Sequence, residues 1–246
     1  MKNVLITGAT GGIGQSLVKV FHVNGYNVCA TGTNVEKLSF LEKKYEARFK
    51  GIQCDLSDDD QLKKLAEESN KYYGSTNILI NNAGITKDNL FLRMKDDEWN
   101  DVININLNSN YKLTKIVIKD MIKSKWGRIV NISSDAAKIG NPGQSNYVAS
   151  KSAIEGLTRT IANEVASRGI TVNCVAPGFV KTEILDSVDK KRLSMMEEKI
   201  PLGRIGNVDE IASAVYYLSS EESSYITGPV SYTHLTLPTK CLVVLW

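Results

Sequence analysis

Tyr147 and Lys151 have the residue types and the spacing for proton transfer. They lie four positions apart at the start of a segment with helical periodicity, so the phenol and the ammonium would project from one helix face. A free phenol has a pKa of about 10, and a neighbouring cation favours the phenolate and lowers that pKa. The pair could therefore act as an acid and a base near neutrality. On most helices this pattern is only a solvated face.

Two serines end the strand-like run that precedes this helix. Ser133 and Ser134 follow an apolar, β-branched segment upstream of Tyr147. A hydroxyl at that point could hold a carbonyl oxygen and stabilise the charge that develops on it. Spacing alone does not choose between the two serines, and the alternative role is a hydroxyl that caps a turn.

A glycine-rich loop near the N-terminus predicts phosphate binding. Gly8, Gly12 and Gly14 form a G-x-x-x-G-x-G pattern between a predicted strand and a predicted helix. Glycines allow a tight turn and close approach of a pyrophosphate, and the helix N-terminus offers free N–H groups. An ordinary glycine turn is the alternative. The expected contacts are Gly8, Thr10, Gly12, Ile13 and Gly14.

Later strand ends extend this site to a whole dinucleotide. Asp55 and Leu56 could border an adenine, and the segment Asn82–Gly84, with Ala83, could border the ribose and nicotinamide. A carboxylate after the second strand would bind the ribose of NAD and repel the 2′-phosphate of NADP. This chain has Thr33 there and no carboxylate before Glu36, which permits NADP. Helix capping is the alternative for Thr33 and for Asp55.

Strand and helix signals alternate from end to end, which predicts the elements that must position these residues. The alternation favours one domain with a doubly wound parallel sheet of the Rossmann type, an α/β fold. Ligands bind at the carboxyl ends of such strands. The predicted strands are Asn3–Thr7, Tyr26–Thr31, Phe49–Cys54, Asn77–Asn81, Arg128–Ser133 and Ile170–Val175. The predicted helices are Ile13–Asn24, Val35–Tyr45, Gln61–Tyr73, Asp97–Lys123 and Tyr147–Ser167.

Composition excludes several classes of protein. The 246 residues are 42% hydrophobic and 23% charged, with a net charge of +3, which fits neither a disordered chain nor a nucleic-acid-binding one. No apolar run reaches the roughly 18 residues of a membrane span, and no signal peptide is evident. The 4 cysteines are scattered and only 2 histidines are present, so we expect no metal site, a reducing compartment and a cytoplasmic location.

With these motifs in order, the chain resembles the classical short-chain dehydrogenases/reductases from about Asn3 to Gly228. The resemblance implies four catalytic residues. Ser134, selected by the family's serine-to-tyrosine separation, would hold the substrate oxygen, and Tyr147 would donate the proton. Lys151 would bind the nicotinamide ribose and lower the Tyr147 pKa. Asn106 would anchor a water that relays protons through Lys151.

The same resemblance completes the ligand contacts. It adds Pro177, Gly178, Val180 and Thr182 on the nicotinamide side of the cofactor, with Tyr147 and Lys151 also in contact. Asn141 and Gln144 would face the substrate together with Ser134 and Tyr147. Residues 184–200 would lie over the site, where their apolar side chains could line an acyl channel or simply pack.

Further runs, at residues 143–147, 166–173, 175–179, 201–204 and 224–228, resemble the subfamily of 3-oxoacyl-(acyl-carrier-protein) reductases. That implies NADPH-dependent reduction in fatty acid biosynthesis, an acyl-carrier protein as partner and a homotetramer. Lys125, Arg128 and Arg168 are candidate docking cations for an acidic carrier, the first and last favoured by the resemblance. The alternatives are a reductase of a CoA thioester, sugar or steroid, and a non-catalytic NADP-binding module.

The resemblance stops after Gly228. Residues 230–239 look like the translation of a transposon-end sequencing adapter. We therefore expect a family domain at 1–228 and a non-family, artefactual tail at 229–246, which puts the seventh strand and the tetramer contacts in doubt. A genuine divergent tail is the alternative, with Pro229 tolerated at a strand start.

Overall fold

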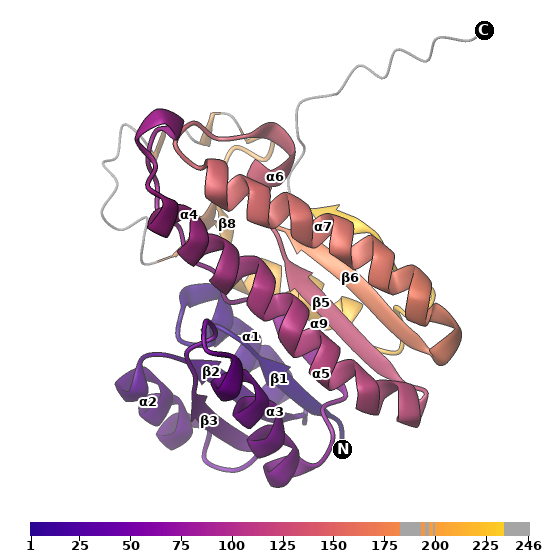
Figure 1. Ribbon diagram of the computed structural model, residues 1–246. Helices are drawn as coiled ribbons and strands as arrows, with labels where there is room; N and C mark the ends of the chain where they lie inside the picture. The colour runs from indigo at the N-terminus through magenta and orange to yellow at the C-terminus, as the bar shows by residue number, and fades with distance from the viewer. Residues whose placement is uncertain (183–192, 195–196, 199, 234–246) are drawn as a thin grey trace, which may run out of the picture.

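Among the residues that the structure describes, seven strands form one parallel sheet, in which the order of the strands reverses direction at the centre. In the computed structural model, which describes residues 1–182, 193–194, 197–198 and 200–233, the sheet order is β3-β2-β1-β4-β5-β6-β9 (Figure 1). The chain runs outward from β1 to β3, then returns to place β4 beside β1, and every pairing is parallel. This is the predicted doubly wound Rossmann-type fold, with its switch point between β1 and β4.

The observed bounds agree with the predicted segments to within about two residues. The strands are β1 Asn3–Ile6, β2 Asn27–Gly32, β3 Phe49–Gln53, β4 Ile78–Asn81, β5 Gly127–Ile132, β6 Ile170–Ala176 and β9 Val230–Tyr232. The helices are α1 Gly12–Val23, α2 Val35–Tyr45, α3 Asp59–Tyr73, α4 Asp96–Ile103, α5 Ser109–Ser124, α6 Ala136–Ile139, α7 Ser145–Val165 and α9 Val208–Leu218. Short 3₁₀ turns occupy Phe91–Arg93 and Ala166–Arg168.

Alternation along the strands explains why helices cover both faces of the sheet. Side chains of successive strand residues point to opposite faces. In β1, Val4 and Ile6 join a core with α1 and α9, whereas Leu5 joins a second core with α3, α5 and α7. Figure 1 shows α5 and α7 in front of the sheet and α1 behind it. Both faces are buried, which is the reason the strands are continuously apolar.

The long helix predicted over Asp97–Lys123 is not regular. A π-helical turn at Asn104–Asn108 separates α4 from α5. Such turns insert extra backbone into a helix and are frequent at functional sites. Hydrophobic periodicity carried no sign of it.

Helix α9 was not predicted, although the sequence carries a signal for it. Asn207 accepts from the Asp209 N–H, and the Glu210 carboxylate accepts from the Asn207 N–H at 2.7 Å. This Asn-x-x-Glu capping box, followed by apolar positions at helical spacing, marks a helix start. A two-residue pairing of β7 (Val180–Lys181) with β8 (Gly206–Asn207) was also missed.

The seventh strand forms despite the departure from the family pattern. Val230–Tyr232 pairs in parallel with β6, and the Cys174 N–H donates to the Pro229 carbonyl at 3.1 Å. Pro229 precedes the strand, so its missing N–H interrupts no ladder bond. The departure from the family pattern therefore does not prevent Val230–Tyr232 from forming a seventh strand, contrary to the doubt raised from the sequence. Residues 234–246 lie outside the described part of the chain.

Candidate active site

A cleft of about 760 Å³ opens at the carboxyl ends of the central strands. Its volume lies in the usual range for small-molecule sites. All the residues predicted to bind the cofactor line it, and they come from the segments that follow five strands and from helix α7. These are Gly8, Thr10, Gly12, Ile13, Gly14, Thr33, Asp55, Leu56, Asn82, Ala83, Gly84, Tyr147, Lys151, Pro177, Gly178, Val180 and Thr182.

Two glycines of the first loop are required by close backbone approach. Gly8 has φ +65°, and a Cβ there would lie 2.7 Å from the Ala83 Cα. A Cβ on Gly14 would lie 2.2 Å from the Gly8 carbonyl oxygen. The loop therefore turns into the N-terminus of α1 with no room for side chains, leaving a backbone-lined cradle of the kind that binds phosphates.

Thr7 holds this loop and was missed as a site residue. Its hydroxyl accepts from the Asn82 and Ala83 N–H groups, each at 3.0 Å. The Asn82 side-chain amide in turn donates to the Thr7 and Gly8 carbonyls at 2.9 and 3.1 Å. Asn82 thus ties the end of β4 to the glycine loop. The threonine at the end of the first predicted strand was the available signal.

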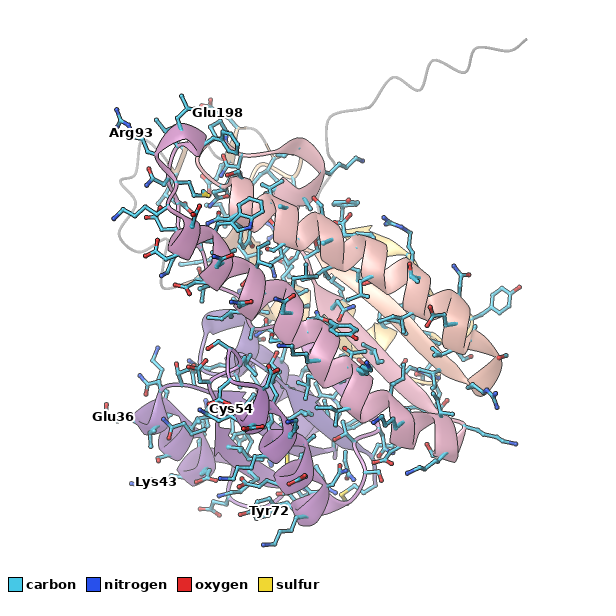
Figure 2. All side chains as sticks on the ribbon, viewed as in Figure 1. Glu36, Lys43, Cys54, Tyr72, Arg93 and Glu198 are labelled. Atoms are coloured by element: carbon cyan, nitrogen blue, oxygen red, sulfur yellow. The ribbon has the colours of Figure 1, made fainter. Side chains whose placement is uncertain are left out.

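The adenine end of the cleft is shaped by turns. The Asp55 carboxylate accepts from the Ser57 N–H at 2.9 Å and from its hydroxyl at 2.7 Å, while Asp58 caps α3. Asp55 therefore supports the turn rather than the cap. Beside it Thr33 follows β2 without a carboxylate, and Figure 2 shows Glu36 pointing outward from α2.

The structure distinguishes the two serines. Ser133 is 3% exposed, and its hydroxyl donates to the Glu155 carboxylate at 2.9 Å and lies 3.2 Å from the Lys151 carbonyl. Ser134 is half-buried, its hydroxyl accepts from the Ala136 N–H at 3.2 Å, and its interaction with the Tyr147 phenol lowers the pKa of that phenol. Both serines line the cleft, and the hydroxyl of Ser133 is engaged by Glu155. The assignment of Ser134 as the catalytic serine stays a prediction.

The pKa of Tyr147 is raised, whereas the sequence predicted that Lys151 would lower it. Burial raises the pKa of its phenol, and the hydrogen bond with Ser134 opposes that rise. Lys151 is not the controlling influence, because its amine lies 5.6 Å from the centre of the ring. In the protein by itself desolvation dominates, so the phenol is protonated at neutral pH.

Lys151 is buried without a carboxylate partner among the described residues. It is 3% exposed, and its amine donates to the Ile132 carbonyl at 2.7 Å. Burial lowers the pKa of the amine to about 8. It therefore carries most of its charge at neutral pH and faces the cleft.

The side-chain amide of Asn106 forms its hydrogen bonds with other groups of the protein. It accepts from the Ile85 N–H at 2.8 Å and donates to the Ile85 carbonyl and the Ser150 hydroxyl at 3.0 and 3.1 Å. It does not line the cleft. A Cβ on Gly84 would lie 3.2 Å from the Lys151 amine and 3.4 Å from the Asn106 oxygen, so both groups pack close to Gly84. The water-anchoring role stays a prediction.

Beneath the site, a buried amide network joins four elements. Asn131 of β5 accepts from the side-chain amides of Asn81 and Asn110 at 2.9 and 3.2 Å, and donates to the Thr158 hydroxyl at 2.8 Å. Asn110 lies one helical turn after Asn106. The network fixes α5 and α7 against β4 and β5, and so sets the positions of the residues above it.

Asn131→Ala is expected to lower the free energy of unfolding by at least about 2 kcal/mol, because it leaves buried donors without partners. Urea unfolding of the two proteins would measure the difference. Asn163→Ala, which removes one exposed local hydrogen bond on α7, should stay within about 0.5 kcal/mol. Equal effects of the two variants would contradict the role given to the network.

Lys151→Met is expected to stabilise the protein at pH 7. A shift of the amine pKa from 10.5 to about 8 corresponds to roughly 3 kcal/mol. The folded pKa is the lower one, so the unfolded chain binds more protons between pH 8 and 10.5 and wild-type stability rises through that window. The difference in the free energy of unfolding between Lys151→Met and wild type should therefore be largest below pH 8 and should fall towards zero as the pH approaches 10.5.

Urea unfolding at pH 7 and at pH 10 checks this expectation. Lys64→Met, at an exposed position of α3, is the control and should show no such pH dependence. A Lys151→Met protein less stable than wild type at pH 7 would contradict the assignment of a charged, desolvated amine.

Of the four predicted substrate residues, Ser134 and Tyr147 line the cleft, whereas Asn141 and Gln144 do not. Asn141 donates to Gln144 at 2.7 Å, and Gln144 donates to the Asp88 carboxylate at 2.9 Å. Asn141 is exposed and Gln144 is half-buried, and both lie just before α7. Asp88 is close enough to Tyr147 to raise its pKa, so this chain of contacts lies beside the catalytic end. The predicted segment 184–200 falls mostly outside the described residues.

The docking candidates divide into one buried and two exposed residues. Arg128 is 2% exposed, and its guanidinium bonds the Ser220 carbonyl at 3.1 Å and lies 4.5 Å from the Trp126 ring centre. The prediction that it could dock a carrier was therefore wrong, because the side chain is used in packing. Lys125 and Arg168 are exposed, near the amino ends of β5 and β6.

Two expected absences can be examined only for the described residues. Among them no helix has both the length and the apolarity to cross a membrane. Nor does any group of histidine, cysteine and acidic side chains in that part of the chain have the arrangement of a metal site.

A doubly wound sheet with a glycine cradle, a buried lysine, and a half-buried tyrosine and serine beside it defines a nucleotide-dependent oxidoreductase. The chain belongs to the short-chain dehydrogenase family, whose model matches residues 2–193. It is 44% identical over 227 residues to the 3-oxoacyl-[acyl-carrier-protein] reductase FabG of Rickettsia conorii, covering 92% of each chain. The FabG of Pseudomonas aeruginosa is also 44% identical, with 92% of this chain and 93% of that protein covered. Nodulation protein G of Rhizobium sp. strain N33 is 43% identical, with 92% of this chain and 93% of that protein covered.

Proposed function

We propose that this enzyme reduces 3-oxoacyl-(acyl-carrier protein) to the 3-hydroxyacyl form with NADPH. The observation that carries the proposal is that Ser134, Tyr147 and Lys151 line one dinucleotide-sized cleft together with the glycine-rich loop. The names of the FabG relatives, at 44% identity, support the substrate class.

Features at both ends of the cleft support NADPH as the cofactor. The backbone turn at Gly8 and Gly14 suits the pyrophosphate, since a Cβ at either position would collide with neighbouring backbone and force the loop to move. At the adenine ribose, Thr33 leaves no carboxylate to repel a 2′-phosphate. Pro177 and Gly178 would border the nicotinamide. When bound, the cofactor supplies the hydride.

The side chains of the site have distinct roles in this reaction. Tyr147, kept protonated by burial, donates its proton to the oxygen of the substrate as negative charge develops there. Ser134 donates a hydrogen bond to the same oxygen and holds it. The charged Lys151 amine stabilises the phenolate left behind and binds the ribose of the cofactor. Asn141 and Gln144 are proposed to contact the substrate beyond the cleft.

We further propose a cytoplasmic homotetramer that takes its substrate from an acidic carrier protein at Lys125 and Arg168. These residues lie at the opposite end of the sheet from Tyr147. A carrier docked there would have to deliver its acyl group to another subunit. Light scattering on the purified protein would test the assembly.

Oxidation of NADPH by the purified protein tests the reaction. Acetoacetyl-acyl-carrier protein is expected to be reduced faster than acetoacetyl-CoA at equal concentration. Faster turnover of the CoA thioester, or of a sugar or steroid ketone, would show that the enzyme acts on that class of substrate instead. Absence of turnover with every ketone, despite NADPH binding, would support a non-catalytic module.

The tail at 229–246, proposed to be artefactual, is tested separately. Resequencing the locus from fresh DNA should yield a different C-terminal sequence. Recovery of the same codons would show that the tail is genuine.

A further inference from the structure

Glu155 is a buried carboxylate that the proposed reaction does not use. It lies on α7 one helical turn after Lys151 and is 8% exposed. Burying a carboxylate is costly unless its oxygens are bonded. Within the described residues no ion pair reaches it, and its partners are two hydroxyls.

One of those hydroxyls belongs to Ser133, the residue directly before Ser134. The Ser133 hydroxyl donates to Glu155 at 2.9 Å and also lies 3.2 Å from the Lys151 carbonyl. Its N–H donates to the Val175 carbonyl at 2.8 Å. Ser133 is therefore held by α7 on one side and by β6 on the other, at the point where β5 ends and the loop with Ser134 begins.

The second hydroxyl comes from the last strand. Tyr232 of β9 donates to Glu155, with its oxygen 3.1 and 3.3 Å from the two carboxylate oxygens. Burial and the negative charge of Glu155 raise the pKa of Tyr232 to about 12, so this phenol stays a donor. The carboxylate thus has a fixed orientation, with one oxygen aimed at Ser133.

We propose that Glu155 is a positioning residue for the reaction. Through Ser133 it fixes the end of β5, and so holds the Ser134 hydroxyl in reach of Tyr147 and of the substrate oxygen. The inference rests on the proposed reduction. It assigns a task to a buried group outside the catalytic set, and it depends on the contact of Glu155 with Ser133 rather than on the tail.

Steady-state kinetics with acetoacetyl-acyl-carrier protein test the coupling. Glu155→Ala and Ser133→Ala are each expected to lower kcat about 10-fold, because small displacements of a positioned group have effects of this order or larger. The KM for NADPH should not change, since the cradle is untouched. Glu155→Gln, whose amide oxygen can still accept from Ser133, should recover most of kcat.

The double variant distinguishes positioning from general loss of stability. Two groups that act through one contact are not additive, so Ser133→Ala with Glu155→Ala should also lose about 10-fold. A loss near 100-fold would overturn the proposal, as would single variants within twofold of wild type. Glu164→Gln, at an exposed position of the same helix, is the control and should match wild type.

Crystal structures of Glu155→Ala and Glu164→Gln provide a readout that needs no turnover. The Ser134 Oγ is expected to shift relative to the Tyr147 Oη only in Glu155→Ala. An unchanged Ser134 would overturn the inference. A wild-type protein that does not reduce the thioester would instead overturn the proposed function, and the two structures would still decide the role of Glu155.

Discussion

Tyr147→Phe is expected to lower kcat by about 10²–10⁴-fold, the range for loss of a general acid. Desolvation raises the pKa of the phenol, and the neighbouring Ser134 opposes that rise. Phenylalanine keeps the ring and its packing but removes the transferable proton. The binding of NADPH should change little, because the cradle is formed by residues of the first loop.

The measurement is NADPH oxidation with acetoacetyl-acyl-carrier protein, together with cofactor titration by fluorescence. Tyr225→Phe, at a fully exposed position, is the matched control and should retain wild-type kcat. A Tyr147→Phe enzyme that keeps more than a tenth of wild-type turnover would show that another group supplies the proton.

Gly14→Ala is the second substitution with a large expected effect. Its Cβ would lie 2.2 Å from the Gly8 carbonyl and 2.7 Å from the Ala9 Cα. Both contacts are with backbone, so the loop must move and the phosphate cradle must open. The dissociation constant for NADPH should rise at least about 100-fold, or roughly 3 kcal/mol.

Gly11→Ala is the control within the same loop. Its nearest contact would be the Gly8 carbonyl at 3.7 Å, an ordinary packing distance, and its φ of −85° suits any residue. Isothermal titration of both variants should show a far smaller loss for Gly11→Ala. Similar losses would mean that the loop needs flexibility at each glycine rather than space at Gly14.

The fold class and most of the site followed from local patterns. Alternation of apolar strands and amphipathic helices implies a parallel sheet, and in such a sheet the strand ends meet at one edge. For this reason the order of strands and helices along the chain was enough to assign residues from five strand ends and one helix to one cleft. The spacing of Tyr147 and Lys151 likewise needs only helical geometry.

Hydrogen-bond partners from distant elements could not be obtained in this way. Thr7 contacts the end of β4, and Asn131 joins amides from β4 and α5. The π turn before α5 leaves no mark in hydrophobic periodicity. Each of these features depends on which side chains meet across the core.

The class of fold, the glycine cradle and the tyrosine–lysine pair could be predicted from the amino-acid sequence, because they depend on residues that are neighbours along a strand or helix. The folded structure was needed to show that the Ser133 hydroxyl bonds Glu155. It also showed that burial raises the Tyr147 pKa. Desolvation and hydrogen bonding are set by groups that folding brings together, and spacing along the chain does not encode them.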